Sequence, residues 1–160
     1  MPNHVQNDIC IKGPKATLEQ IAEFMRGPDS AFDFNKILPM PAELQSIATG
    51  GTTIDGKQYR RWRTVDGKDI GIDDAEIARL TAEHGASDWH DWACHHWGTK
   101  WNAYSVGEPT MTSRSLRYRF DTAWASPEPV LQAIADKFGV SISVNVSGEV
   151  DQRYRYAIAA

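Results

Sequence analysis

Strict alternation of inward and outward side chains over residues 116–124, followed at once by a helical pattern, constrains the fold of this chain more than any other feature. The inward positions are Leu116, Tyr118, Phe120, Thr122 and Trp124. A period of two predicts a strand with one buried face. A helix is predicted over 127–138, because Ser126 can cap it, Pro127 suits its first position and Gly139 suits its end.

The start of the chain has the same order of strand and then helix. Alternation over 5–11 predicts a strand, and an apolar stripe with helical spacing predicts a helix over 17–25. Alternation returns at 142–146 and again at 154–158. With the middle of the chain set aside, these elements follow the split β–α–β order of a ferredoxin-like domain.

The predicted fold class is therefore α+β and ferredoxin-like, with a mainly antiparallel sheet and both helices packed on one face. We expect a strand over 100–106 to belong to this sheet and Trp124 to lie in the core. Residues 1–160 are predicted to form a single domain. A long insertion over 47–98, between the first helix and the second strand, is predicted to hold a hairpin or loop and two short helices.

Glycine and capping residues divide the insertion into short elements. Two Asp-Gly steps, at 55–56 and 66–67, suit the tight turns of hairpins. The first helix is predicted to begin after Asp73 and to end at Gly85. The second helix is predicted to have Ser87 as its cap.

Cysteine usage and hydropathy predict a cytoplasmic protein without membrane association. Cys10 and Cys94 are too few for a disulfide framework, so a reducing compartment is the simpler interpretation. Residues 1–8 lack the apolar core of a signal peptide, and no apolar run approaches the ~18 residues of a membrane span. The net charge of −4 opposes bulk attraction to DNA or anionic lipid but is compatible with a local basic patch.

Three segments carry a resemblance to a known family: 34–41 (Phe-Asn-Lys-Ile-Leu-Pro-Met-Pro), 97–102 (Trp-Gly-Thr-Lys-Trp-Asn) and 120–127 (Phe-Asp-Thr-Ala-Trp, then Ser-Pro). Over about 3–146 the chain resembles the YubB-like proteins of phages and plasmids, and the Trp-Gly-Thr-Lys-Trp-Asn hexapeptide is the specific match. The resemblance implies a ferredoxin-like domain and an accessory gene of a mobile element, expressed inside a bacterial host. It carries no accepted catalytic residues, and residues 49–74 depart most from the family pattern.

Residues 57–63 are the most basic stretch and have aromatic residues interleaved. We predict that partner contacts concentrate on residues 50–71, which include this stretch, with Arg60, Trp62 and Arg63 as anchors. Arginine and aromatic side chains together suit phosphates and bases, and they equally suit an acidic protein surface. A solvated hairpin without a partner is the third interpretation that these residues leave open.

A second feature is a group of four tryptophans, namely Trp89, Trp92, Trp97 and Trp101. Their periodicity favours the core over an aromatic ligand cage or a base-stacking platform. If Trp101 is buried on a strand, Lys100 and Asn102 point away from it into solvent. We therefore add Lys100 and Asn102 to the predicted partner-binding residues.

Arginines also alternate with the inward residues of two predicted strands, at Arg117, Arg119, Arg153 and Arg155. A ferredoxin-like sheet leaves this outward face open, as in RNA-binding domains. Those domains place aromatic residues on the open face, whereas Tyr118 and Phe120 are predicted to face inward here. The arginines alone are therefore a weak indication of RNA binding.

No catalytic residue, metal site or cofactor is predicted. The chain lacks the phosphate loop, the Gly-x-Ser-x-Gly elbow and the dinucleotide-binding fingerprint. His90 and Cys94 are one helical turn apart, but a zinc site needs further ligands that the spacing does not supply. A catalytic site assembled from distant residues stays open, because one sequence does not reveal it.

The expected function is that of a non-enzymatic accessory protein of a mobile element that binds a host macromolecule. A host protein, such as a defence or replication component, is the favoured partner. The alternative is a nucleic-acid-binding accessory protein that uses residues 60–63 and the arginine face of the sheet.

Overall fold

The computed structural model describes residues 3–149 and 153–160. The chain divides into two compact units, one made of residues 1–39 with 96–160 and the other of residues 40–95. The first unit is built on a five-stranded sheet and the second on a three-stranded sheet. No helix of the described residues is long and apolar enough to cross a membrane.

The first unit has the order of elements that the sequence predicts, except that the strand predicted over 100–106 is replaced by a short strand at 110–111. Its elements are β1 (His4–Lys12), α1 (Lys15–Met25), the 3-10 helix η1 (Phe34–Lys36), β5 (Thr110–Met111), β6 (Ser115–Ala123), α5 (Glu128–Phe138), β7 (Ser141–Gly148) and β8 (Arg153–Ile158). The sheet order is β5-β6-β1-β7-β8, and every neighbouring pair is antiparallel. Each helix links two strands that have a third strand between them, which is the split β–α–β arrangement. The predicted α+β, ferredoxin-like class is confirmed, and β8 extends the sheet at one edge.

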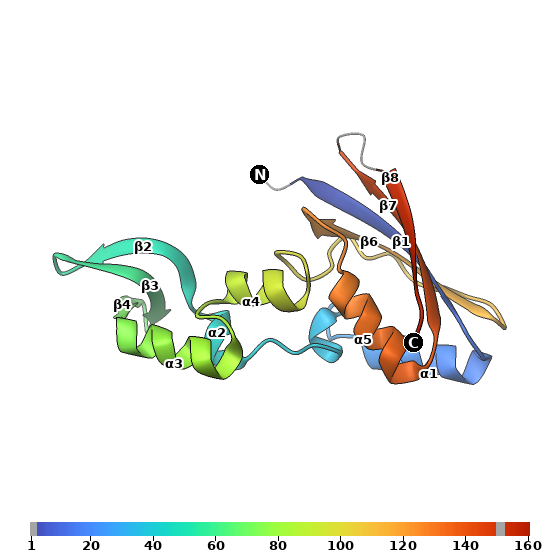
Figure 1. Cartoon of the computed structure of the whole chain (residues 1–160), viewed down its shortest axis with the longest axis horizontal. Helices are drawn as coiled ribbons and strands as arrows, with labels where there is room; N and C mark the ends of the chain where they lie inside the picture. Colours follow the sequence, from blue (N-terminus) through green and yellow to red (C-terminus); the bar gives the residue numbers. More distant parts are fainter. Residues whose placement is uncertain (1–2, 150–152) are drawn as a thin grey trace. The chain divides into compact units, whose positions relative to one another are not determined.

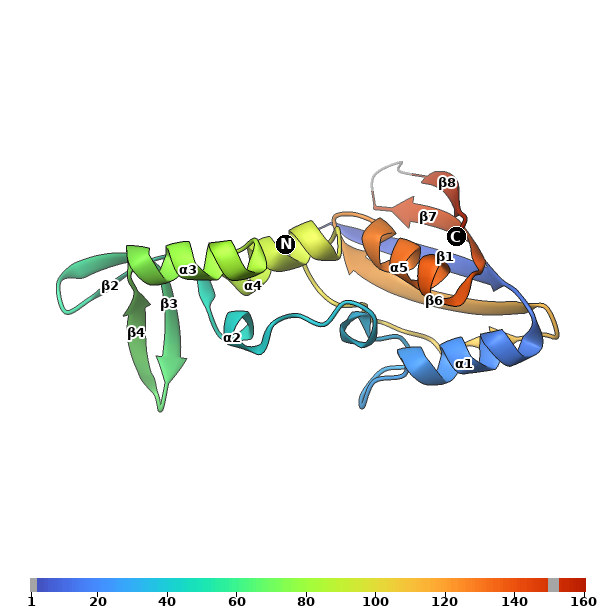
Figure 2. The same cartoon turned by 60° about the horizontal axis from the view of Figure 1, so that its bottom comes forward.

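Helices α1 and α5 cover the same face of the five-stranded sheet, as Figures 1 and 2 show. The rings of Phe24 and Phe138 meet edge to face with centroids 5.5 Å apart. The Lys137 ammonium lies 5.1 Å from the centre of the Phe24 ring and adds a cation–π contact between the helices. The prediction that both helices pack on one face is confirmed.

The core lies between this sheet face and the two helices. Its strand residues include Val5, Ile9, Leu116, Tyr118, Phe120, Ile142, Val144 and Val146, all at most 3% exposed. Phe32, from the segment after α1, stacks on Phe120 with ring centres 4.9 Å apart. One polar pair is buried among them, because Asn7 donates to the Thr122 hydroxyl at 2.9 Å.

Three local predictions in this unit are wrong. Residues 100–106 form no strand beyond a single bridge between Tyr104 and Asp121, because the segment bends at Lys100 and Trp101. The backbone of Trp124 turns to a φ of 73° just beyond β6, and its ring is 46% exposed instead of buried. The Ser126 hydroxyl does not cap α5, since it bonds to the Tyr156 hydroxyl at 2.6 Å.

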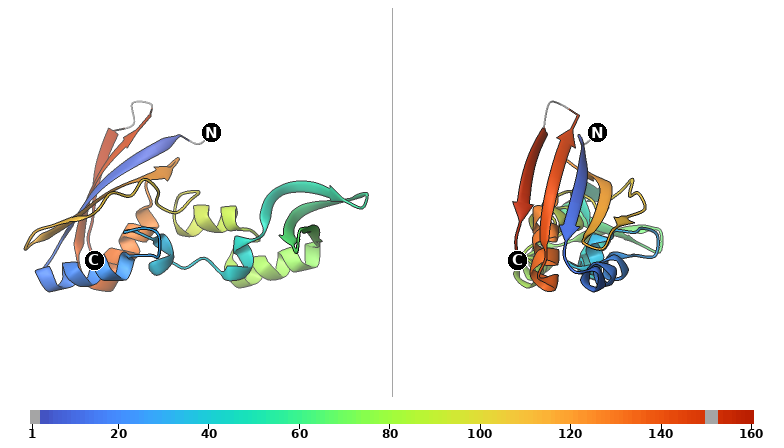
Figure 3. Two further views of the ribbon diagram at one scale, coloured as in Figure 1. Left: turned by 180° about the vertical axis from the view of Figure 1, so that it is seen from behind. Right: turned by 90° about the vertical axis from the view of Figure 1, so that its right-hand side faces the viewer.

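The second unit combines a small sheet with short helices. Its elements are α2 (Ala42–Gln45), β2 (Ala48–Ile54), β3 (Lys57–Val65), β4 (Lys68–Ile72), α3 (Asp74–His84) and α4 (Trp89–His96). The antiparallel strands are joined by tight turns in which Asp55, Gly56, Asp66 and Gly67 have φ values of 48°, 78°, 51° and 74°. Positive φ at both central residues is the geometry that Asp-Gly steps favour. Figure 3 gives two further views of these strands. The predicted bounds of the insertion, 47–98, stay a prediction.

The helix caps of the second unit are partly as predicted. Asp73 caps α3 by accepting a hydrogen bond from the Glu76 amide at 2.8 Å, and Gly85 ends the helix with a φ of 73°. The cap of α4 is Asp88 and not Ser87, because the Asp88 carboxylate accepts from the Asp91 amide at 2.9 Å.

Candidate functional site

The face of the five-stranded sheet opposite α1 and α5 is polar. Alternation places the outward side chains of neighbouring strands in rows that cross the sheet. One row runs Arg119, Asp8, Asn145, Arg155, and the next runs Asp121, Gln6, Ser147, Arg153. Pairing of β6, β1, β7 and β8 thus brings three arginines from distant parts of the sequence onto one surface.

An open groove of about 470 Å³ lies over these two rows. We call it the arginine groove. It is lined by Gln6, Asp8, Arg119, Asn145, Val146, Ser147, Arg153, Tyr154 and Arg155. Guanidinium, amide and hydroxyl groups all donate hydrogen bonds, and the guanidinium fork matches the spacing of two oxygens on one phosphate or carboxylate.

The positive charge of the arginine groove is only partly neutralised. Arg119 Nη2 lies 3.9 Å from Asp8 Oδ2, and these side chains are 66% and 36% exposed. Ion pairs with this exposure contribute about 0–1 kcal/mol. Within residues 3–149 and 153–160, neither Arg153 nor Arg155 forms an ion pair. The groove therefore presents guanidinium groups that an incoming anion can bind.

Exposed aromatic side chains gather where β1 begins and β6 ends. Trp101 and Trp124 are 38% and 46% exposed, and Lys100 Nζ lies 4.9 Å and 5.0 Å from the centres of their rings. The Trp101 ring meets Tyr104 edge to face at 6.2 Å, and the Tyr104 hydroxyl lies 2.6 Å from His4 Nδ1. We call these five residues the aromatic cluster.

Burial raises the pKa of several tyrosine hydroxyls of this unit above the ordinary value of 10. It raises the pKa of Tyr104, and the charges of Asp121 and Glu149 add to the effect. Burial raises the pKa of Tyr118 to about 12. It also raises the pKa of Tyr156, although the hydrogen bond with Ser126 opposes the shift. A tyrosine hydroxyl is neutral near pH 7 in any case, and these shifts extend its neutral range to higher pH.

The three anchors predicted from the basic stretch lie on β3. Arg60 Nη2 is 2.7 Å from Asp74 Oδ1, in a pair with both side chains strongly exposed. Trp62 and Arg63 are half-buried, and in the described part of the chain Arg63 Nε is enclosed without a hydrogen-bond partner. The structure thus gives Arg60 an acidic neighbour and leaves part of the Trp62 ring accessible. The role of these three residues in partner binding stays a prediction.

Lys100 and Asn102 have surroundings that differ from the expected ones. The Lys100 ammonium faces the Trp101 ring instead of pointing away, because these residues lie in a bend and not in a strand. Asn102 is half-buried, and its Oδ1 accepts from the Phe34 amide at 2.9 Å while its Nδ2 donates to Asp33 Oδ1 at 2.6 Å. The Asn102 amide therefore holds η1 in place, and its contact with a partner stays a prediction.

A buried ion pair accounts for another arginine of the basic stretch. The Asp88 side chain is fully buried, and its Oδ2 faces Arg61 Nε as a charge pair without hydrogen-bond alignment. Arg61 Nη2 also lies 3.2 Å from Asp91 Oδ2. Arg61 thus links β3 to the start of α4 and is structural.

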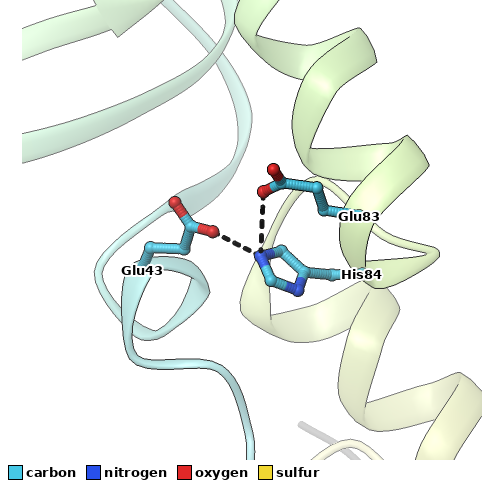
Figure 4. Close-up of side chains that lie close together, drawn as sticks. All are labelled: Glu43, Glu83 and His84. Carbon is cyan, nitrogen blue, oxygen red and sulfur yellow. Dashed lines mark hydrogen bonds and ion pairs between the residues drawn. The ribbon is translucent and has the colours of Figure 1, made fainter.

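Two groups of side chains have donor atoms close enough together for a metal ion. They are Glu43, Glu83 and His84 (Figure 4) and Asp88, His90 and Asp91. In the first group, Arg79 forms ion pairs with Glu43, Glu76 and Glu83, and it lowers the pKa of Glu43, with His84 as the next cause. A guanidinium therefore already pairs with both carboxylates of this group.

The second group is likewise paired with an arginine, because Arg61 contacts both of its aspartates. His90 Nε2 lies 3.9 Å from Cys94 Sγ, the contact expected one helical turn apart. Among the described residues, neither group has a fourth donor close enough to complete a ligand set. The absence of a bound metal stays a prediction.

Sequence reasoning identified the arginines of the groove but missed their polar neighbours Asn145 and Ser147. The signal was present, because polar residues alternate with apolar ones along 141–147. Sequence reasoning considered Trp101 for an aromatic cage and named Lys100 as a binding residue, but it favoured burial of Trp101 and Trp124 and did not bring in His4 or Tyr104. Trp101 and Tyr104 lie in an irregular segment, where periodicity does not indicate which side chains are exposed.

Comparison with known proteins agrees with this fold. Residues 96–149 match the family model described as a ferredoxin-like domain in Api92-like protein. The match covers roughly a third of the chain and includes β5, β6, α5 and β7. The curated proteins and the solved structures give no significant match. The chain is therefore similar to this ferredoxin-like domain over the second half of its first unit, and the narrower resemblance to YubB-like proteins stays a prediction.

Proposed function

We propose that this protein is a non-enzymatic nucleic-acid-binding protein and that the arginine groove holds the phosphate backbone. The observation that carries the proposal is the row in which Arg119 and Arg155 flank Asp8 and Asn145, with Arg153 in the next row. Arginine binds phosphate oxygens through two parallel hydrogen bonds, which a single lysine does not do. Arginines spaced across one open surface suit a polyanion better than an isolated anion.

The surroundings of the groove support a polymeric ligand. The sheet face is open, so a nucleic-acid strand can enter and leave the groove at its ends. Asn145 and Ser147 supply neutral donors between the arginines, and protein–nucleic acid contacts commonly use such side chains on phosphate and sugar. Because the whole chain carries a net charge of −4, attraction to phosphate is local to this face.

The resemblance to YubB-like proteins supports the setting of this function. We propose an accessory protein of a phage or plasmid that works in the cytoplasm of a bacterial host. The macromolecule that it binds there is RNA or DNA of the host or of the element itself.

The test is a binding titration with labelled single-stranded RNA and DNA of about 20 nucleotides, followed by fluorescence anisotropy. In the double variant Arg119→Ala/Arg155→Ala, affinity should fall by at least about tenfold, because each charge-assisted hydrogen bond contributes about 1.5–3 kcal/mol. The matched control is Lys15→Ala/Lys36→Ala, which removes two exposed positive charges from α1 and η1, neither of which lines the groove. Equal losses in both variants would show that only bulk charge matters and would overturn the proposed site.

A second candidate is the host-protein partner favoured by the sequence, bound through β3. The observation in its favour is that Trp62 stays partly exposed between Arg60 and Arg63 on one strand. Tryptophan and arginine are enriched at the energetic centres of protein interfaces. Pull-down from host lysate, with and without nuclease, separates the two candidates. Recovery of a host protein that survives nuclease treatment and is lost in the variant Arg60→Ala/Trp62→Ala/Arg63→Ala would support the β3 surface.

A further inference from the structure

We infer that the aromatic cluster is a base-stacking subsite at the end of the arginine groove, so that the ligand is single-stranded nucleic acid. This inference rests on the proposed function and adds the class of ligand. It assigns the phosphates to the arginines and at least one unpaired base to Trp101 or Trp124.

The exposure of two tryptophans is the first observation. Trp92 and Trp97 are 5% and 4% exposed, whereas Trp101 and Trp124 are 38% and 46% exposed. Large aromatic rings usually contribute stability through burial, so rings that stay open to solvent beside one another suit a ligand with flat faces.

The way in which the rings are held is the second observation. Lys100 Nζ lies about equally far from both ring centres, at 4.9 Å and 5.0 Å, and so links the two tryptophans. Tyr104 supports Trp101 from the side at 6.2 Å, while its hydroxyl is fixed by His4 and by the Thr122 carbonyl at 3.1 Å. The cluster is therefore a constructed surface with a cation at its centre, which suits a base and its adjacent phosphate.

The backbone at Trp124 is the third observation. Its φ of 73° lies in the left-handed region, which a bulky residue rarely adopts, and its amide donates to the Asn3 carbonyl at 2.9 Å. Residues held in such conformations are concentrated at functional sites. Here the conformation places an exposed ring directly after the last core residue of β6.

The cluster continues the arginine groove. His4 and Gln6 lie on the same side of β1, since they are two residues apart in a strand, and Gln6 lines the groove. Tyr104 pairs with Asp121, which is opposite Gln6. One row of the sheet, about 7 Å, therefore separates the groove from the cluster.

Two acidic residues between the arginine groove and the aromatic cluster indicate how a bound nucleic-acid strand would run. Asp121 pairs with Tyr104, and Glu149 lies 4.0 Å from His4 Nε2. Phosphate is repelled close to the carboxylates of Asp121 and Glu149, where an uncharged base is tolerated. The favourable arrangement therefore has phosphates over Arg119, Arg153 and Arg155 and bases over the aromatic rings.

The test compares three probes of equal length: a single-stranded oligothymidine of about 20 nucleotides, an abasic strand with the same phosphates, and a DNA duplex. Wild-type protein should bind oligothymidine roughly 5- to 150-fold more tightly than the abasic strand, the effect of one stacked base. It should also prefer oligothymidine to the duplex, whose bases are already stacked. Equal affinity for oligothymidine and the abasic strand would overturn the inference while leaving the proposed function intact.

The variants are chosen so that misfolding does not imitate loss of binding. Trp124→Asn removes the ring and places at φ 73° a residue that tolerates this conformation. The double variant Trp101→Ala/Trp124→Asn should lose the preference for oligothymidine and keep its affinity for the abasic strand. Trp101→Phe should retain most of the preference, and Met111→Ala, an exposed apolar residue on β5, should retain all of it. A preference that survives in the double variant would contradict the subsite, and failure of all three probes to bind would instead remove the proposed function.

Discussion

Arg119 on β6 and Arg155 on β8 occupy the same row of the five-stranded sheet, separated only by Asp8 and Asn145. The residues are far apart in sequence, and their alignment depends on the register of three strand pairs. A shift of one residue in any pair would turn one arginine toward the core. The buried alternation that fixes the core therefore also fixes the arginine groove.

The carboxylate of Asp8 should weaken binding of a polyanion, because it lies in this row and contacts Arg119 at 3.9 Å. We expect Asp8→Asn to raise affinity for a single strand by about two- to fivefold, the effect of removing one partly screened charge. The gain should shrink at high salt. Glu23→Gln, an exposed position on α1, is the matched control and should change affinity little. A lower affinity in Asp8→Asn would indicate that Asp8 orients Arg119.

The pair Asp88 and Arg61 should be a main determinant of stability in the second unit. Asp88→Asn keeps an oxygen to cap α4 but leaves the Arg61 guanidinium without its buried counter-charge, so it should cost about 3 kcal/mol. Asp88→Ala also removes the cap and should cost about 1 kcal/mol more. Urea unfolding followed by circular dichroism measures both changes. A near-neutral Asp88→Asn would mean that water solvates Arg61 well enough to replace the pair.

Gly71 should not tolerate a side chain, because a β-carbon there would overlap the ring of Tyr59. We expect Gly71→Ala to destabilise the protein by about 1–3 kcal/mol through overpacking. In a Tyr59→Ala background the same change should cost much less, because the obstructing ring is gone. Thermal unfolding of the four proteins of this cycle gives the coupling. Additive effects would rule out the proposed contact.

The ion-pair network around Arg79 should make stability depend on pH in the acidic range. Arg79, and after it His84, hold the pKa of Glu43 below its ordinary value of 4.5. Because folding lowers this pKa, the contribution of Glu43 is complete above about pH 4.5 and is lost as the pH falls through the folded-state value. Melting temperatures of wild type and Glu43→Gln should therefore differ at pH 7 and converge at lower pH. A difference independent of pH would exclude the charge as its cause.

Local patterns were sufficient to predict the ferredoxin-like part of the fold. The alternation of residues 116–123 and 142–146 and the capping glycine at 139 depend on neighbours in sequence, and each appears where the sequence predicts it. The Asp-Gly turns are equally local, since positive φ is a property of the residues themselves.

The errors arise where a long-range contact overrides the local pattern. Asn102 looks like an outward strand residue, but its amide is used by Phe34 and Asp33 from the segment after α1. Trp124 completes an alternating series, but the strand ends one residue earlier and its ring stays exposed. The arginine groove needs the pairing of β1 with β7 and of β7 with β8, which periodicity alone does not specify.

The salt dependence of binding tests the central claim most directly. The logarithm of affinity for a single strand of about 20 nucleotides is measured against the logarithm of salt concentration between about 50 and 200 mM. If Arg119, Arg153 and Arg155 contact phosphates, each change to alanine should reduce the slope by about 0.7, and the changes should add. An unchanged slope in the triple variant, or wild-type binding insensitive to salt, would contradict nucleic-acid binding by the arginine groove.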